Sequence, residues 1–138
     1  MLRRILLLLA LTVFIAGCGG GGGVPPNQPP TVTTATVAPA ELPFIGGTVT
    51  ITAEVTDDDT VATVSAQVAG AGGTDTVTLA LNGEQYTGDY VADGNPGPDE
   101  DAYTVTVTAT DNKGATSDPV SRDFTVAEPS TPPLPPDF

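Results

Sequence analysis

Short runs in which apolar and polar residues alternate constrain this chain more than any other feature. Beyond residue 30 these runs are rich in Val and Thr, and Gly, Asp, Asn and Pro separate them. In the run 47–56 every odd position from Val49 onward is apolar, and Val77, Leu79 and Leu81 repeat the pattern further along. A period of two places successive side chains on opposite faces of a strand. We therefore expect an all-β chain, because no stretch of this part has helical periodicity.

Two turn signals and the number of runs extend this prediction. The dipeptide Asn82-Gly83 predicts a type I′ hairpin turn, because both residues tolerate positive φ. Asp111-Asn112-Lys113-Gly114 predicts a turn before the last run. The runs number seven and cover about 31–38, 47–56, 60–69, 74–82, 84–92, 102–110 and 118–127. Seven short antiparallel strands in about a hundred residues predict one β-sandwich, and 138 residues leave little room for a second core.

Two segments resemble bacterial immunoglobulin-like, PKD-like and cadherin-like extracellular domains. They are Asn-Gln-Pro-Pro-Thr-Val at 27–32 and Tyr-Thr-Val-Thr-Val-Thr-Ala-Thr-Asp-Asn-Lys-Gly at 103–114. The resemblance covers about 31–127 and implies a seven-stranded immunoglobulin-like sandwich. The chain departs from these families because it has no Trp, no second Cys and no Trp-Asp-Phe-Gly-Asp-Gly stretch of PKD domains.

Tyr103 is the structural residue that this resemblance singles out. It follows Asp101-Ala102 at the start of the sixth run, where such domains carry a tyrosine corner. In that motif the phenol packs inside and its hydroxyl bonds to nearby backbone. The alternative is that Tyr103 is an ordinary core aromatic.

The first 17 residues have the layout of a secretory signal. Two arginines near the start precede an apolar run from Ile5 to Ile15, which is about half of the roughly 20 residues that a membrane-spanning helix needs. The sequence Ile-Ala-Gly-Cys at 15–18 resembles the bacterial lipobox. This resemblance implies that Cys18 becomes the lipidated first residue of the mature protein, held on the membrane by several acyl chains.

The regions that flank the expected sandwich lack core-forming residues. Residues 18–30 are rich in Gly and Pro and predict a disordered tether, and residues 128–138 predict a Pro-rich tail. Gly19 stands where some Gram-negative lipoproteins carry an Asp that retains them in the inner membrane. The expected location is therefore the cell envelope, and the outer membrane if the source is Gram-negative.

Charge and composition exclude several functions. The formal net charge is −13, and beyond Cys18 the only basic residues are Lys113 and Arg122, so nucleic acid is not an expected partner. The chain has no His, which removes the commonest general base and zinc ligand. Its acidic runs, 57–59 and 99–101, fall in strand connections where water keeps carboxylates ionised. We expect no enzyme and no resident cofactor.

Calcium and carbohydrate are the two ligands left open. Oxygen donors suitable for calcium occur at Asp57, Asp58, Asp59, Asp99, Asp101, Asp111 and Asn112. The same residue types are standard turn formers, so we expect solvated loops with only a weak, non-selective response to calcium, and a calcium site is the alternative. Tyr86 and Tyr90 share one face of the fifth run and would offer a sugar-binding platform if exposed.

These observations favour a membrane-anchored extracytoplasmic module without catalytic activity. It would act in adhesion, protein binding or spacing at the cell envelope. Its expected partners are the membrane, through lipidated Cys18, and a protein or glycan of unknown identity. The competing hypotheses are a carbohydrate-binding or calcium-binding surface module and an enzyme accessory domain or degenerate hydrolase.

Overall fold

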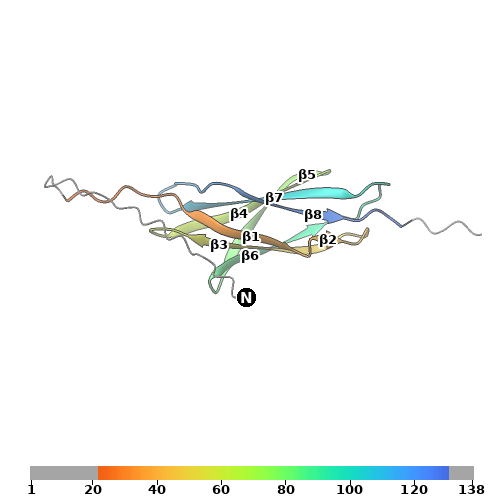
Figure 1. Cartoon of the computed structure of the whole chain (residues 1–138), viewed down its shortest axis with the longest axis horizontal. Coiled ribbons are helices and arrows are strands. Elements are labelled where there is room, and N and C mark those ends of the chain that lie inside the picture. The colour runs from red at the N-terminus through yellow and green to blue at the C-terminus, as the bar shows by residue number, and fades with distance from the viewer. Residues whose placement is uncertain (1–21, 131–138) are drawn as a thin grey trace, which may run out of the picture.

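Eight strands and no helix make up residues 22–130, the part of the chain that the computed structural model describes (Figure 1). The strands are β1 (Thr31–Ala38), β2 (Glu41–Leu42), β3 (Gly47–Thr56), β4 (Val61–Gly70), β5 (Gly73–Asn82), β6 (Gln85–Ala92), β7 (Asp101–Asp111) and β8 (Val120–Val126). The expected all-β class is confirmed, and seven strands match the seven predicted runs to within two residues. Because this part contains no helix, no helical membrane span occurs in it. The predicted signal segment and Cys18 lie outside the described residues.

One strand joins the two layers of the fold. The strand order is β1-β3-β6-β5-β4-β7-β8-β2. β5 pairs with β4 from Gly73 to Leu79 and then with β6 from Ala80 to Asn82. Since β1 also lies close to β7 and β8, the sheet nearly closes into a barrel. The change of partner also turns Leu81 outward, where it is 62% exposed, although the alternation alone placed it on the buried face.

β2 is the strand that the sequence pattern missed. It has two residues between Pro39 and Pro43, which is too short to show a period. It pairs with β8 in parallel, so the expectation of seven wholly antiparallel strands is wrong on both points. The pairing uses N–H groups of Thr125 and Ala127, which donate to the carbonyls of Ala40 and Leu42 at 3.0 and 2.9 Å. These partners lie more than eighty positions away along the chain, so no local pattern reveals them.

The β5–β6 hairpin is confirmed, but its turn is displaced by one residue. Asn82 pairs with Gln85, so the two loop residues are Gly83 and Glu84. Gly83 has a φ of 67°, and no other residue type has positive φ among those described. Positive φ at the first loop position alone is the signature of a type II′ turn, whereas the predicted type I′ turn needs it at both.

The core lies between the inward faces of the two layers. Its members are Val32, Ala35, Leu42, Val49, Ile51, Ala53, Val64, Ala66, Val68, Leu79, Ala92, Tyr103, Val105, Val107, Ala109, Phe124 and Val126. Most are small, so the aromatic rings supply much of its bulk. Tyr103 stacks on Phe124 with ring centroids 4.7 Å apart and planes 7° from parallel. Tyr90 packs at a tilt against both rings.

The described chain enters the domain at one end and leaves it at the other (Figure 1). Thr31, which begins β1, pairs with Thr56 at the end of β3. Val126, which ends β8, pairs with Asp101 at the start of β7. We call these ends the N-terminal pole and the C-terminal pole. An eleven-residue strand such as β7 spans roughly 35 Å, so the poles are well separated.

Candidate functional site

The turn that follows β7 is organised by a buried carboxylate. Asp111 is 2% exposed. Its Oδ1 accepts the backbone N–H groups of Lys113 and Ala115 at 2.8 and 2.9 Å, and its Oδ2 accepts Nδ2 of Asn27 at 2.5 Å. The Asn27 amide, together with these backbone donors, holds the pKa of Asp111 below its usual value against the opposing effect of burial. Asp111 is therefore not the solvated turn residue that its position in the sequence suggests.

Asn27 connects the segment before β1 to this turn. It is partly buried, and its bond to Asp111 joins residues 84 positions apart. Pro30, three residues later, is buried. The last residues of the segment expected to serve as a tether thus lie against the domain. Asn27 is the first residue of the Asn-Gln-Pro-Pro motif, but nothing in the sequence indicates its contact with Asp111.

Asp57 lies at the same pole, directly after β3. Both of its carboxylate oxygens, and Oδ1 of Asn27, are shielded from solvent and have no hydrogen-bond partner within residues 22–130. The next two aspartates are in different surroundings. Asp58 is exposed, and Asp59 forms an ion pair with Lys113 at 2.8 Å between Oδ2 and Nζ. This ion pair, with the hydrogen bond it contains, lowers the pKa of Asp59 and raises that of Lys113.

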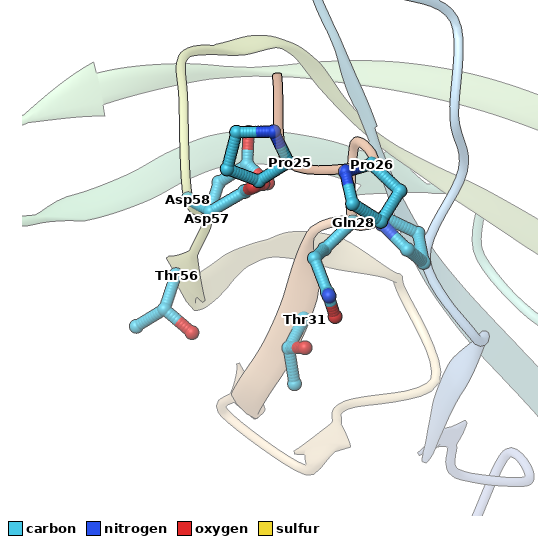
Figure 2. A pocket seen from close by; sticks show the side chains of 8 residues that line it. Pro25, Pro26, Gln28, Thr31, Thr56, Asp57 and Asp58 are labelled. Carbon is cyan, nitrogen blue, oxygen red and sulfur yellow. The ribbon is translucent and has the colours of Figure 1, made fainter. Parts of the chain in front are cut away.

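An open hollow is lined by the segment before β1 and by the end of β3 with the loop that follows it (Figure 2). The lining combines proline rings of that segment with the side chains of Asp57 and Asp58. Its lining consists of Pro25, Pro26, Gln28, Pro29, Thr31, Thr56, Asp57 and Asp58. The hollow is the place where the predicted tether and the acidic loop 57–59 meet.

The seven predicted calcium ligands divide between the two poles. Asp57, Asp58, Asp59, Asp111 and Asn112 lie at the N-terminal pole, and Asp99 and Asp101 lie at the C-terminal pole. No group of three His, Cys, Asp or Glu side chains among the described residues is arranged to hold a metal. At the C-terminal pole the organising residue is Asn95, which the sequence analysis missed. Its buried amide donates to the carbonyl of Asp99 at 2.6 Å and accepts the N–H of Gly97 at 2.8 Å.

The tyrosines belong to the core more than to the surface. Tyr103 is 8% exposed and stacks on Phe124, and its hydroxyl has no hydrogen-bond partner within the described part of the chain. Tyr86 and Tyr90 are half-buried and pack against the core. The Tyr90 hydroxyl donates to Oδ2 of Asp75 at 3.2 Å, and burial together with this carboxylate raises the pKa of Tyr90 to about 12.

Large exposed apolar side chains occur at the C-terminal pole. Phe44 and Ile45, in the turn between β2 and β3, are 47% and 70% exposed, and Val91 near the end of β6 is 68% exposed. The carbonyl of Phe44 accepts the N–H of Asn95 at 2.8 Å, which ties this turn to the loop after β6. No sequence pattern singles out these residues, because they lie outside the alternating runs or on the polar faces of those runs.

Comparison with known proteins identifies the fold and no family. No protein-family model matches the chain, and no curated protein matches it. Among solved structures, the PKD domain of an M14-like peptidase from a Thermoplasmatales archaeon is similar, with 20% identity and a TM-score of 0.50 over 75% of this chain and 100% of that domain. This similarity supports an immunoglobulin-like, PKD-type fold, although the PKD sequence motif is missing.

Two other solved structures superpose more loosely. An engineered protein is 27% identical with a TM-score of 0.44 over 68% of this chain, which spans only 19% of that protein's length. A conjugative transposon lipoprotein from Bacteroides eggerthii is 19% identical with a TM-score of 0.37 over 70% of this chain and 96% of its own. These TM-scores are too low to bear on function.

Proposed function

We propose that this protein is a lipid-anchored, extracytoplasmic immunoglobulin-like module that acts without catalysis in adhesion, protein binding or spacing at the cell envelope. The observation that carries the proposal is the placement of the two poles. The described segment before β1 reaches the domain at the N-terminal pole, and the described chain leaves at the opposite pole (Figure 1). An anchor at Cys18 would hold the N-terminal pole near the membrane and direct the C-terminal pole outward.

The anchor itself rests on the resemblance of residues 15–18 to the lipobox. Cys18 is the only cysteine in the chain, and its sulfur is the atom that could carry a thioether-linked lipid. If the source is Gram-negative, the residue after Cys18 favours the outer membrane. Intact mass spectrometry of the protein from its native host tests this directly. A mature chain that begins at acylated Cys18 is expected, and an unmodified Cys18 or a different first residue would overturn the anchoring.

The absence of catalysis is supported by the residues available for chemistry. The chain has no His to activate a serine. The acidic hollow at the N-terminal pole is open and places two adjacent aspartates beside prolines, which is unlike the walled cleft that raises the pKa of a catalytic carboxyl. Because Phe44 and Ile45 are exposed apolar side chains, they favour binding of a protein partner at the C-terminal pole.

A carbohydrate-binding function receives less support. A sugar platform needs aromatic faces open to solvent, whereas Tyr86 and Tyr90 pack against the core. The ring of Tyr90 also contacts the rings of Tyr103 and Phe124, which makes it part of the core packing. We therefore place protein partners ahead of glycans.

The proposed orientation is tested with site-specific labels. Because lipidation would consume the only native cysteine, a cysteine introduced at Ile45 or at Asn112 gives one reactive thiol at either pole. With the full-length protein in vesicles, a lipid-soluble quencher should reduce the fluorescence of a label at Asn112→Cys more than that of a label at Ile45→Cys. Equal quenching, or the reverse order, would contradict the orientation. A Cys18→Ser variant controls for anchoring, since it keeps the fold and should release both labels from the vesicles.

A further inference from the structure

We propose that the C-terminal pole binds a cationic protein segment, one that carries an apolar side chain next to lysine or arginine. The binding surface consists of Phe44 and Ile45 with the acidic side chains at the same pole, and we call it the C-terminal tip. This inference rests on the proposed function and deepens it, because it names the chemistry of the partner. It does not need the anchor, since every residue of the tip belongs to the described domain.

Apolar side chains gather at the turn between β2 and β3. Phe44 and Ile45 are both exposed in this turn. Val91 is also exposed, and it pairs with Thr48, which follows the turn closely at the start of β3. Single exposed apolar residues are ordinary on a protein surface, whereas a group of them at one end of a domain indicates a contact site.

The backbone of this turn is held in place. Gly46 N–H donates to the Pro43 carbonyl at 2.8 Å, which closes the turn. Gly46 has a φ of 78°, and a Cβ at this position would clash with the carbonyl oxygen of Ala92. The turn therefore packs directly on the chain that follows β6. Because a fixed turn loses little conformational entropy on binding, its exposed side chains are preorganised for a partner.

Asn95 connects the acidic loop before β7 to the same turn. Its N–H donates to the Phe44 carbonyl at 2.8 Å. Its buried side-chain amide donates to the carbonyls of Asp99 at 2.6 Å and Val126 at 3.4 Å. One residue thus joins the turn after β2, the loop 96–100 and the end of β8. The acidic residues of these segments are held at the same end of the domain as the exposed turn.

The charge at this pole has one sign. Its exposed acidic side chains are Glu41, Asp93, Asp99, Glu100 and Glu128. The two basic residues of the described chain lie elsewhere, because Lys113 pairs with Asp59 at the opposite pole and Arg122 lies in the middle of β8. Carboxylates without a neighbouring cation attract a positively charged partner and repel a negative one.

This charge decides which occupant fits the tip. A second copy would bring the same acidic side chains against the first set, and like charges across an interface are unfavourable. A bilayer would have to accommodate the carboxylates together with the apolar side chains, and anionic lipids would repel them. A protein segment with lysine or arginine next to an apolar residue is complementary to both parts of the tip.

Peptide display against the full-length protein in lipid nanodiscs tests the tip with a defined probe, a library of short random peptides. The selected peptides should carry a net positive charge and at least one large apolar residue. A synthetic peptide of selected sequence, labelled with a fluorophore, then gives the affinity by fluorescence anisotropy. Because salt screens exposed charges, the affinity should fall several-fold when NaCl is raised from about 50 mM to about 500 mM.

The apolar half of the tip is tested with Ile45→Ser. This change should weaken the affinity for the peptide by roughly tenfold or more, because it removes the more exposed of the two apolar side chains of the turn. Leu81→Ser is the matched control. Leu81 is also exposed, but it pairs with Tyr86 in the β5–β6 hairpin, and Tyr86 pairs with Ala53 near the end of β3. Leu81 therefore lies toward the N-terminal pole, and its loss should leave the affinity unchanged.

The acidic half is tested with the double variant Asp99→Asn/Glu100→Gln. It should weaken the affinity by roughly three- to tenfold and make it less dependent on salt. The control Asp58→Asn/Asp118→Asn removes the same number of charges from exposed side chains at the N-terminal pole. It should keep both the affinity and most of its salt dependence.

The proposal is overturned if no peptide is selected, if the selected peptides are acidic or uncharged, or if each variant and its control change the affinity equally. It is also overturned if Ile45→Ser dissociates a dimer in sedimentation, or if it releases Cys18→Ser protein from phosphatidylcholine vesicles, because a second copy or a bilayer would then occupy the tip. Binding that responds to Leu81→Ser instead would overturn the tip and leave the proposed protein-binding function intact. An unmodified Cys18 would overturn the anchor and leave the tip intact.

Discussion

Gly70, the last residue of β4, lies directly against the ring of Tyr103. A Cβ placed on Gly70 would come within 2.4 Å of both Cδ1 and Cε1 of that ring. The ring cannot move aside freely, because it stacks on Phe124. The absence of a side chain at position 70 is thus what allows the aromatic cluster to pack at the C-terminal pole.

Gly70→Ala should destabilise the domain by about 1 to 3 kcal/mol, the usual cost of overpacking a filled core. Urea unfolding followed by tyrosine fluorescence measures the change. Gly72→Ala is the matched control, because a Cβ at Gly72 meets nothing within 4 Å. If both variants lose the same stability, the loss comes from the glycine backbone and not from the contact with Tyr103.

Tyr103→Ala should cost about 3 to 5 kcal/mol, as large-to-small changes of buried aromatics do. Tyr103→Phe should change stability by less than about 0.5 kcal/mol, because the Tyr103 hydroxyl makes no hydrogen bond to the described residues. A tyrosine corner would instead lose about 1 kcal/mol with its hydroxyl. Chemical denaturation of both variants therefore separates a packing role from a hydrogen-bonding one.

Tyr90 should make the protein less stable at alkaline pH. Its folded-state pKa of about 12 lies above the ordinary value of 10.0, so its contribution is fully present below about pH 10 and is lost as the pH rises through 12. Tyr90→Phe should flatten the fall in stability across that window. Ultraviolet titration of tyrosinate should also lose its latest component in this variant. If the wild type and the variant lose stability in parallel, Tyr90 has no raised pKa.

The two residues of the dipeptide Asn82-Gly83 should respond differently to replacement by alanine. Gly83→Ala should cost about 1 to 2 kcal/mol, because Gly83 has positive φ, which a residue with a Cβ adopts only under strain. Asn82→Ala should stay within about 0.5 kcal/mol, since Asn82 is the last paired residue of β5. Comparable losses in both variants would favour the type I′ turn that the sequence suggested.

The sequence alone determined the strands and most of the turns. The alternation of apolar and polar residues with a period of two depends only on residues that are close in the sequence. It located seven strands because each strand needs one buried face. The dipeptide Asn82-Gly83 located the β5–β6 hairpin, because the backbone preferences of a turn residue are also local. The short β2 carries no such signal, and its bonds to β8 exist only in the folded chain.

The tertiary structure decided which polar residues are buried. Asp57, Asp58 and Asp59 are identical side chains at adjacent positions, yet one is shielded, one is exposed and one is paired with Lys113. Burial depends on which other part of the chain contacts a carboxylate, and for Asp111 that part includes Asn27. For this reason the sequence could indicate acidic loops, but only the fold showed that Asp57 and Asp111 belong with Asn27 at one pole.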